Sequence, residues 1–483
     1  MRENEKFLYK RKIKSNPKIN CLFAFPGIES FALSSLGYLS IFRELDEMDD
    51  VYIERYYLNS QTTVVPLQNI DIIVFSSSFE LDILQILKML EKLGVPPLVR
   101  DRGKNHPIVC AGGPVMTSNP YPYLELFDFI NIGDSNMGKI AASLCEGKNL
   151  EEIAEIEGVL MSPCAKVKKV TNEITVPVYT AILSDKSYFK DTFVIEIARG
   201  CPKMCNFCIA SHHNLPFRCA DKGKVFKAID LGLEHTNKIA LLGAYVAGHP
   251  DFKEILNYIG EKGGVELSLS SLRADLTDKD VIKALVACGA QTSTIAIEAG
   301  SEALRKSINK NLSDEQIAQT VKTAREGGLK GLKIYAIIGL PEETQDDLKA
   351  LVVLLAKLKK ENKGFDLSVS LNSFIPKPNT PFENAKREDI KSLEKKAAYL
   401  KKELHKIGVK ISVSSIDWDG VQTLISRYPQ SLASYFVDVY KQGGNLGAFK
   451  RCWKTFSDIP FEEAVTTPPT SRPWKNICIT LQK

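Results

Sequence analysis

The sequence predicts an α/β protein with a doubly wound N-terminal domain, a partial (β/α)6 barrel and a mainly α C-terminal segment. Two observations carry this prediction. Short apolar runs alternate with amphipathic helical patterns in two successive regions, and the second region repeats the alternation six times. The 483 residues also exceed one ordinary hydrophobic core. We expect four segments, at residues 1–146, 147–190, 191–385 and 386–483.

The first segment has the alternation of a Rossmann-like, doubly wound sheet. Its predicted strands are 71–75, 107–110 and 129–132. A polar turn, Ser76-Ser77-Ser78, and an amphipathic helix over 81–93 follow the first of these strands, and Gly112-Gly113-Pro114 closes the second. Ligands of such sheets bind beyond the carboxyl ends of the strands, where these turns lie.

A connector with short strand-like pieces precedes a second and longer alternation, which begins at Asp191. Its six predicted strands are 192–198, 238–242, 265–270, 292–297, 332–338 and 366–374. Ser313 with Gln316 and Thr344 with Asp347 have the spacing of capping boxes, so helices are expected to begin there. Six successive β/α units predict a parallel barrel or partial barrel, which places function at the C-terminal ends of its strands.

The last segment begins with a long basic helix over 387–407, whose apolar residues step by three and four. We interpret it as a solvated helix packed on the barrel, rather than as a nucleic-acid or membrane surface. The remaining stretch, from Ser414, contains Trp418, Trp453 and Trp474 and no pattern that indicates chemistry.

The composition favours a soluble, cytoplasmic protein. The formal net charge is +5, from 63 basic and 58 acidic residues, which gives no strong nucleic-acid signal. The strongest apolar run, over 350–356, is far shorter than the ~20 residues of a transmembrane helix. The eleven cysteines are an odd number spread over a long chain, which argues against a secreted disulfide framework.

Three cysteines are bunched directly after the first barrel strand. Cys201, Cys205 and Cys208 have the spacing C-x3-C-x2-C, on a βα loop at the expected functional face. Thiolates suit soft metals and iron–sulfur clusters. Three of them can hold three corners of a cuboidal [4Fe–4S] cluster, which leaves one iron open to a substrate or cofactor.

The spacing alone leaves two other metal sites open. A structural zinc site needs four ligands, and His212 or His213 could serve as the fourth. An electron-transfer cluster needs a fourth cysteine, and Cys219 lies eleven residues after Cys208.

The cysteine signature, on the predicted β/α architecture, resembles the radical S-adenosylmethionine (SAM) superfamily. The resemblance implies that the amino and carboxylate groups of SAM chelate the open iron. It also implies that an electron from the reduced cluster cleaves SAM to methionine and a 5′-deoxyadenosyl radical. The electron would come from a low-potential donor of the flavodoxin or ferredoxin type.

The same resemblance implies SAM contacts at the ends of the barrel strands. Phe207, beside the third cysteine, would contact the adenine. Gly243 and Ala244 stand where the family keeps a glycine-rich turn for the methionine amino group, without the acidic residue often found there. Ribose or methionine contacts are expected from Ser268, Ser270 and Glu298, an adenine contact from Gly339, and a contact with the SAM carboxylate, or with a structural acid, from Arg273 and Arg305.

The N-terminal segment resembles the cobalamin-binding domain that precedes many radical SAM domains. The residues that carry this resemblance are Ser76-Ser77-Ser78-Phe79-Glu80, Ala111-Gly112-Gly113-Pro114, Ser118-Asn119-Pro120 and Ile132-Gly133-Asp134. Cobalamin contacts are expected from Ser76, Ser77, Gly112 and Gly113, because paired glycines let a loop approach a macrocycle closely.

One element of that domain is missing. The Asp-x-His-x-x-Gly motif, which supplies a histidine to cobalt, is absent, and His106 is the only histidine before the cysteine triplet. Cobalamin would therefore bind without that ligand. A plain Rossmann-like turn, in a domain that has lost its ligand, is the alternative.

Three functions follow from these readings. The favoured one is a cobalamin-dependent radical SAM methyltransferase that acts on an unactivated carbon of a small-molecule or peptide substrate. The second is a radical SAM enzyme of rearrangement, ring formation or coupling. The third, from another class, is a non-catalytic iron–sulfur or zinc protein.

Overall fold

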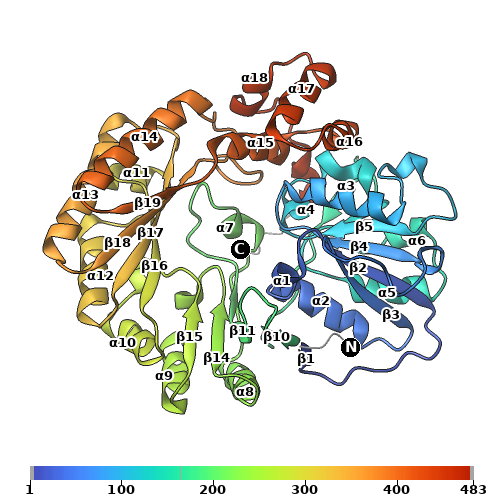
Figure 1. The fold of residues 1–483 in the computed structure, drawn as a ribbon, viewed down its shortest axis with the longest axis horizontal. Coiled ribbons are helices and arrows are strands. Elements are labelled where there is room, and N and C mark those ends of the chain that lie inside the picture. Colours follow the sequence, from blue (N-terminus) through green and yellow to red (C-terminus); the bar gives the residue numbers. More distant parts are fainter. Residues whose placement is uncertain (1–4, 164, 479–483) are drawn as a thin grey trace.

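The computed structural model describes residues 5–163 and 165–478, which form two lobes (Figure 1). The N-terminal lobe contains a six-stranded sheet in the order β3-β2-β4-β5-β6-β7. Its strands are β2 (Ile19–Phe25), β3 (Val51–Tyr57), β4 (Ile72–Ser76), β5 (Ile108–Gly112), β6 (Phe129–Asn131) and β7 (Val159–Leu160). The first five run parallel, and β7 is antiparallel to β6. The strand order reverses between β2 and β4, which marks the ligand-binding end of such sheets.

Helices cover both faces of this sheet, because successive strand residues point to opposite sides. Cys21 and Phe23 belong to the buried cluster under one set of helices, and Leu22 and Ala24 to the cluster on the other face. The helices of this lobe are α1 (Glu29–Ala32), α2 (Leu36–Asp46), α3 (Asp82–Leu93), α4 (Pro114–Ser118), α5 (Met137–Cys145) and α6 (Leu150–Ala154).

The second lobe is an arc of parallel strands with its helices on the outside (Figure 1). Its strands are β11 (Thr192–Glu196), β14 (Lys238–Leu242), β15 (Glu266–Leu269), β16 (Thr292–Glu298), β17 (Gly331–Ile338), β18 (Asp366–Ser373) and β19 (Lys410–Val413). Hydrogen bonding joins β11-β14-β15 and β16-β17-β18-β19, and the parallel bridge between Leu272 and Ile295 links the two groups. The outer helices are α8 (Lys222–Leu233), α9 (Phe252–Lys262), α10 (Lys279–Ala287), α11 (Glu302–Ser307), α12 (Asp314–Glu326), α13 (Gln345–Glu361) and α14 (Ile390–Lys406).

The six expected barrel strands all occur within two residues of their predicted bounds, and both predicted capping boxes are formed. Strand β19 was not expected. It lies in the segment expected to be helical and pairs in parallel with β18, so the arc extends beyond residue 385.

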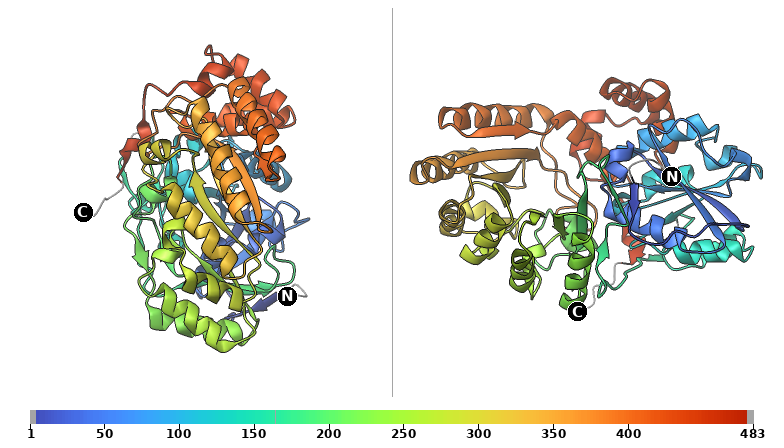
Figure 2. Two further views of the ribbon diagram at one scale, coloured as in Figure 1. Left: turned by 90° about the vertical axis from the view of Figure 1, so that its left-hand side faces the viewer. Right: turned by 60° about the horizontal axis from the view of Figure 1, so that its bottom comes forward.

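The C-terminal helices pack on the first lobe, not only on the barrel (Figure 2). They are α15 (Ile416–Arg427), α16 (Ala433–Lys441), α17 (Leu446–Phe456) and α18 (Phe461–Thr466). Phe436 stacks on Tyr123 with ring centroids 5.8 Å apart, and Trp453 and Trp474 are fully buried. Trp418 makes an edge-to-face contact with Phe449, so it is also a packing residue.

Short strands tie the connector to both ends of the described chain. β1 (Glu5–Phe7) pairs with β10 (Ile182–Ser184), β20 (Ile477–Cys478) pairs with β8 (Val167–Lys168), and β9 (Val178–Tyr179) pairs with β11. Within residues 5–163 and 165–478, no helix combines the length and apolar character that a membrane span requires.

Candidate cofactor-binding site

The three cysteines lie on one loop that leaves and rejoins a short antiparallel ribbon. The ribbon is β12 (Ala198–Arg199) with β13 (Arg218–Cys219), and α7 (Ile209–His213) lies within the excursion. Gly200 begins it with φ +82°, and a Cβ there would lie 2.2 Å from the carbonyl oxygen of Asn214, so only glycine fits.

The loop is anchored to the turn after α11. The Asn206 N–H donates to the Ile308 carbonyl at 3.0 Å, and the Asn309 amide donates to the Met204 carbonyl at 2.8 Å. Cys201 and Cys205 are buried and Cys208 is half-buried. Burial raises the pKa of the Cys205 thiol, against the influence of the Lys310 ammonium. Metal ligation would keep such a thiol deprotonated.

The other potential ligands are engaged elsewhere. His212 Nε2 lies 3.2 Å from the Cys205 carbonyl, and buried His213 Nε2 lies 3.1 Å from the Pro378 carbonyl. Cys219 is fixed in β13, opposite Ala198. In the part of the chain that the structure describes, no three Cys, His, Asp or Glu side chains converge on one ion position.

A buried ion pair stands at the carboxyl end of β16. Glu298 has φ +70° at a bulge against β17, and its Oε1 lies 3.0 Å from Lys310 Nζ. Both side chains are buried. A non-glycine residue in the left-handed region costs about 1–2 kcal/mol and often marks a functional site. The sequence analysis indicated Glu298 but missed Lys310. Lys310 lies between Asn309 and Asn311, two residues suited to positive φ, and this pattern could have drawn attention to the turn.

Arg273 is paired within its own segment. Its guanidinium donates to both carboxylate oxygens of Asp275, at 2.8 and 3.2 Å, and to the Lys310 carbonyl at 3.2 Å. Lys203, between the first two cysteines, lies 3.5 Å from the same Asp275. Arg273 therefore stands beside the Glu298–Lys310 pair, held by an acid that the sequence analysis did not single out.

The sequence left two roles open for Arg305, a contact with SAM and a structural ion pair, and the structure places it in the structural one. It is fully buried, donates to the carbonyls of Ala299, Gly300 and Leu312, and pairs with Asp314. Its N–H groups clamp the turn that follows β16, so it is not available to a SAM carboxylate.

The remaining SAM candidates line the same edge of the arc. A Cβ on Gly243 would lie 2.6 Å from the Ala198 carbonyl, and the Ser270 hydroxyl donates to the Gly243 carbonyl at 3.0 Å. Gly339 has φ +75°, and its N–H donates to Glu343 at 2.7 Å. Ala244 and Ser268 are exposed on the inner side, and Phe207 packs half-buried against a small apolar cluster that includes Leu340 and Phe374.

Of the cobalamin candidates of the first lobe, Gly113 lines a cavity, whereas Gly112, Ser76 and Ser77 belong to the strand ends and their turn. Gly113 has φ +119°, and its Cβ would meet the Ser77 carbonyl at 2.1 Å; it also lines a cavity. Gly112 and half-buried Ser76 pair across β5 and β4. Ser77 is only 1% exposed and its N–H donates to the Gly112 carbonyl, so its role is to fix the turn.

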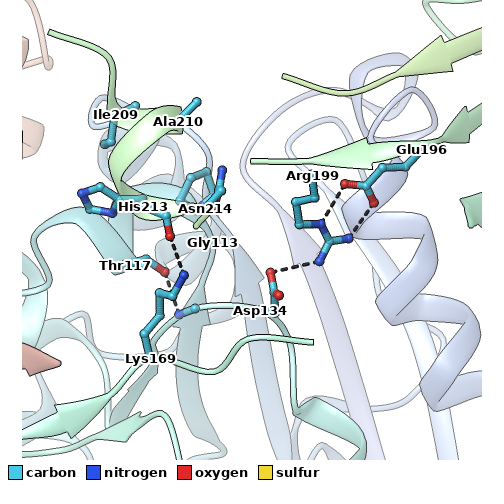
Figure 3. A pocket seen from close by; sticks show the side chains of 12 residues that line it. Gly113, Thr117, Asp134, Lys169, Glu196, Arg199, Ile209, Ala210, His213 and Asn214 are labelled. Carbon is cyan, nitrogen blue, oxygen red and sulfur yellow. Dashed lines mark hydrogen bonds and ion pairs between the residues drawn. The ribbon is translucent and has the colours of Figure 1, made fainter. Parts of the chain in front are cut away.

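Two cavities lie at the carboxyl end of the sheet in this lobe, and the first of them reaches the cysteine loop. One, of about 410 Å³, is bounded by the turns after β5 and β6 and by α7 (Figure 3). The other, of about 470 Å³, is bounded by α2, the turn after β6 and Leu242. Both have Asp134, Glu196 and Arg199 in their walls. Of these three, the sequence analysis had singled out only Asp134.

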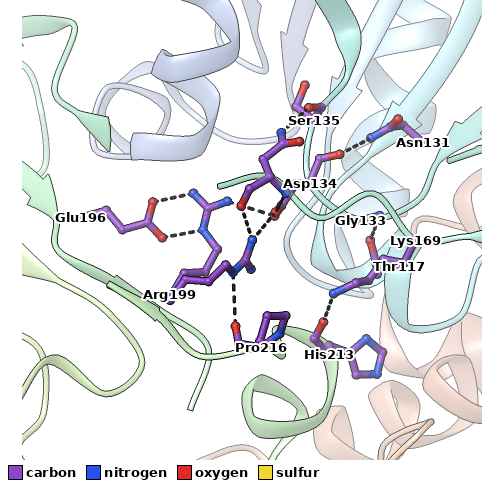
Figure 4. A network of polar contacts seen from close by, with 12 residues as sticks. Thr117, Asn131, Gly133, Asp134, Ser135, Lys169, Glu196, Arg199, His213 and Pro216 are labelled. Carbon is purple, nitrogen blue, oxygen red and sulfur yellow. Dashed lines mark hydrogen bonds and ion pairs between the residues drawn. The ribbon is translucent and has the colours of Figure 1, made fainter. Parts of the chain in front are cut away.

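A charged network crosses this boundary (Figure 4). Asp134 pairs with Arg199 at 3.0 Å and with Arg218 at 3.1 Å, while Glu196 accepts from Arg199 at 2.8 and 2.6 Å. Asp134 is 65 or more residues from both arginines, so no local pattern in the sequence could reveal these two pairs.

Two family profiles match the chain: "Radical SAM proteins, N-terminal" over residues 38–159 and "Radical SAM superfamily" over residues 195–355. An uncharacterized protein of Methanocaldococcus jannaschii is 30% identical, over 86% of this chain and 90% of its own length. The chain therefore belongs to the radical SAM superfamily. Membership implies SAM and a [4Fe–4S] cluster as cofactors, and it makes the chain a radical SAM enzyme.

Two further similarities refine this picture. An uncharacterized methyltransferase of Pyrococcus horikoshii is 25% identical, over 54% of this chain and 60% of its own length. The cobalamin-dependent SAM radical enzyme OxsB, solved with aqua-cobalamin bound, superimposes with a TM-score of 0.54 at 14% identity, over 96% of this chain and 83% of OxsB. The second likeness establishes a shared fold.

Proposed function

We propose that this radical SAM enzyme binds cobalamin between its lobes and methylates an unactivated carbon of a small-molecule or peptide substrate. The observation that carries the proposal is the pair of adjoining cavities at the carboxyl end of the doubly wound sheet, of which the first reaches the cysteine loop. Sheets of this type bind ligands at that end. The two cavities share Asp134, Glu196 and Arg199 in their walls, so one large ligand could contact both.

Cys201, Cys205 and Cys208 would hold the cluster, and a low-potential flavodoxin or ferredoxin would reduce it. When bound, the cluster supplies the electron for reductive cleavage of SAM. The loop fits this role because its backbone is fixed to the turn after α11.

SAM would lie along the carboxyl ends of β14 to β17. Lys310 holds the Glu298 carboxylate in place, and an oriented carboxylate can accept hydrogen bonds from hydroxyl groups. The Lys310 ammonium has further N–H donors for a carboxylate, a role that Arg305 cannot fill. Gly243 packs against the Ala198 carbonyl, and the backbone of Gly243 and Ala244 would contact the methionine amino group.

Cobalamin, when bound, supplies the transferable methyl group. Gly113 and Gly133 line the first cavity and would present backbone atoms to the cofactor, while a Cβ on either would meet the Ser77 or Val170 carbonyl oxygen at 2.1 or 2.3 Å. His213 is the histidine in that wall, and its Nε2 is engaged by Pro378. Binding without a histidine ligand from this chain is what the missing Asp-x-His-x-x-Gly motif predicts.

The test is anaerobic reconstitution with iron, sulfide and aqua-cobalamin, followed by reduction in the presence of methyl-deuterated SAM. We expect about one bound corrinoid per chain, formation of 5′-deoxyadenosine and label in the recovered corrinoid. Formation of 5′-deoxyadenosine without corrinoid binding would contradict the proposal and favour rearrangement, ring formation or coupling. Absence of 5′-deoxyadenosine with bound zinc would favour a non-catalytic metal protein.

A further inference from the structure

Lys169 is a buried cation in the wall of the 410 Å³ cavity (Figure 3). It follows β8 in the connector, and only 6% of the residue is exposed. Its ammonium donates to the carbonyl of His213. Across the described ranges, no carboxylate lies within ion-pairing distance of Lys169, although an ammonium can make three hydrogen bonds.

The nearby carboxylates are already committed. Asp134 is shared between Arg199 and Arg218, and Glu196 is held by both arms of the Arg199 guanidinium (Figure 4). This network thus joins two carboxylates to two guanidinium groups, and it leaves Lys169 without a carboxylate partner of its own. Burial lowers the pKa of Lys169, as do Arg218 and Arg199, and Asp134 opposes this. Buried charges are normally paired, so the arrangement is incomplete without an anion.

We propose that this cavity binds an anionic group, a phosphate or carboxylate, through Lys169. Thr117 supports the same site. Its hydroxyl oxygen accepts from the Gly133 N–H at 2.8 Å, which leaves its own O–H to donate toward the cavity. The nearest alternative, a purely structural lysine that caps the end of α7, would leave the ammonium without a counter-charge.

The source of the anion rests on the proposed function. The phosphodiester of the nucleotide loop is the one anionic group of cobalamin, and the cavity lies at the carboxyl end of the sheet where that cofactor is proposed to bind. A cobalamin phosphodiester is therefore the ligand that we assign to Lys169. An anionic group on the substrate is the other source of the same chemistry.

The experiment compares two corrinoids on the full chain. Aqua-cobalamin carries the phosphodiester and aqua-cobinamide lacks it. Affinities are measured by absorbance titration for the wild type, Lys169→Met, Lys169→Arg and the matched control Lys168→Met. Lys168 is the neighbouring residue, with a side chain 63% exposed and a surface partner, Glu157, at 2.8 Å.

We expect Lys169→Met to weaken cobalamin binding about tenfold or more, with cobinamide binding unchanged. Lys169→Arg should restore most of the loss, and Lys168→Met should bind both corrinoids like the wild type. The melting temperature of the ligand-free Lys169→Met variant should not fall, because the substitution removes an uncompensated buried charge. A clear fall would instead indicate a structural lysine and overturn the proposal.

The remaining outcomes separate the two sources and the two proposals. If Lys169→Met binds cobalamin normally but loses stabilisation by inorganic phosphate, the anion site stands and the corrinoid source is wrong. If Lys169→Met binds cobalamin normally and is still stabilised by inorganic phosphate, the proposed anion site is refuted. If the wild type binds neither corrinoid, the proposed function fails, and the phosphate response alone then decides the role of Lys169.

Discussion

Arg199 of β12, two positions before Cys201, forms an ion pair with Asp134 of the N-terminal lobe at 3.0 Å. Asp134 also holds Arg218, on the strand where the loop returns. One carboxylate of the first lobe therefore fixes both ends of the cysteine loop of the second lobe.

Replacing that carboxylate should loosen the loop. Asp134→Asn leaves Arg199 and Arg218 without their shared partner, and removing one member of a largely buried pair costs about 2 kcal/mol or more. We expect a lower melting temperature and a lower iron content after reconstitution. The control Glu157→Gln, at an exposed pair with Lys168, should change neither the melting temperature nor the iron content. Full iron retention in Asp134→Asn would refute this anchoring role.

The cysteines make the sharpest prediction about the cluster. Cys205→Ala should abolish both the brown iron–sulfur chromophore and 5′-deoxyadenosine formation, because only three ligands hold the cluster. Cys288→Ala, at a buried core cysteine, should retain both and lose only about 1 kcal/mol of stability. If 5′-deoxyadenosine still formed with Cys205→Ala, the assignment of the ligands would be wrong.

Lys310 should act on SAM and not on the cluster. Lys310→Met is expected to raise the KM for SAM about tenfold or more, because the ammonium orients Glu298 and is placed to meet a carboxylate. Lys310→Arg should recover part of the loss. Because Lys310→Met leaves a buried carboxylate unpaired, the double variant Glu298→Gln with Lys310→Met should regain stability without regaining SAM affinity. An unchanged KM in the single variant would exclude the role.

Arg305 should behave in the opposite way. Arg305→Met removes hydrogen bonds to three carbonyls and the pair with Asp314, so the free energy of unfolding should fall by about 3 kcal/mol or more. The folded fraction should keep a normal KM for SAM. A raised KM with normal stability would show that Arg305 contacts SAM after all.

Acid should weaken the attachment of the C-terminal helices through Glu80. Although burial raises its pKa, Lys377, Ser426 and Gln422 together hold the pKa of Glu80 below its usual range. A depressed pKa in the folded state adds stability that is full above the unfolded value of about 4.3 and is lost as the pH falls through the lower folded value. Thermal unfolding followed from pH 7 down to pH 3 should show this loss, and Glu80→Gln should flatten that part of the profile.

The sequence predicted what local patterns encode. The barrel strands were recognisable because buried residues such as Ile334 and Ile338 alternate with solvent-facing ones, and the cysteine triplet because its spacing is local. Strand β19 was missed because four residues inside a basic region carry too little pattern. The pairing of Asp134 with Arg199 and Arg218 could not be predicted, since a guanidinium does not indicate which distant acid it meets.

The first lobe has consequences for how the chain is made. Its sheet is completed early in synthesis, yet the apolar side formed by α3 and residues 121–126 is covered by α16, whose Phe436 stacks on Tyr123 and which emerges only after the whole barrel. A nascent or truncated chain ending near residue 413 would expose that side to solvent. Shortened forms are thus expected to aggregate, and the ribosome-bound lobe is expected to need chaperone protection until translation is nearly over.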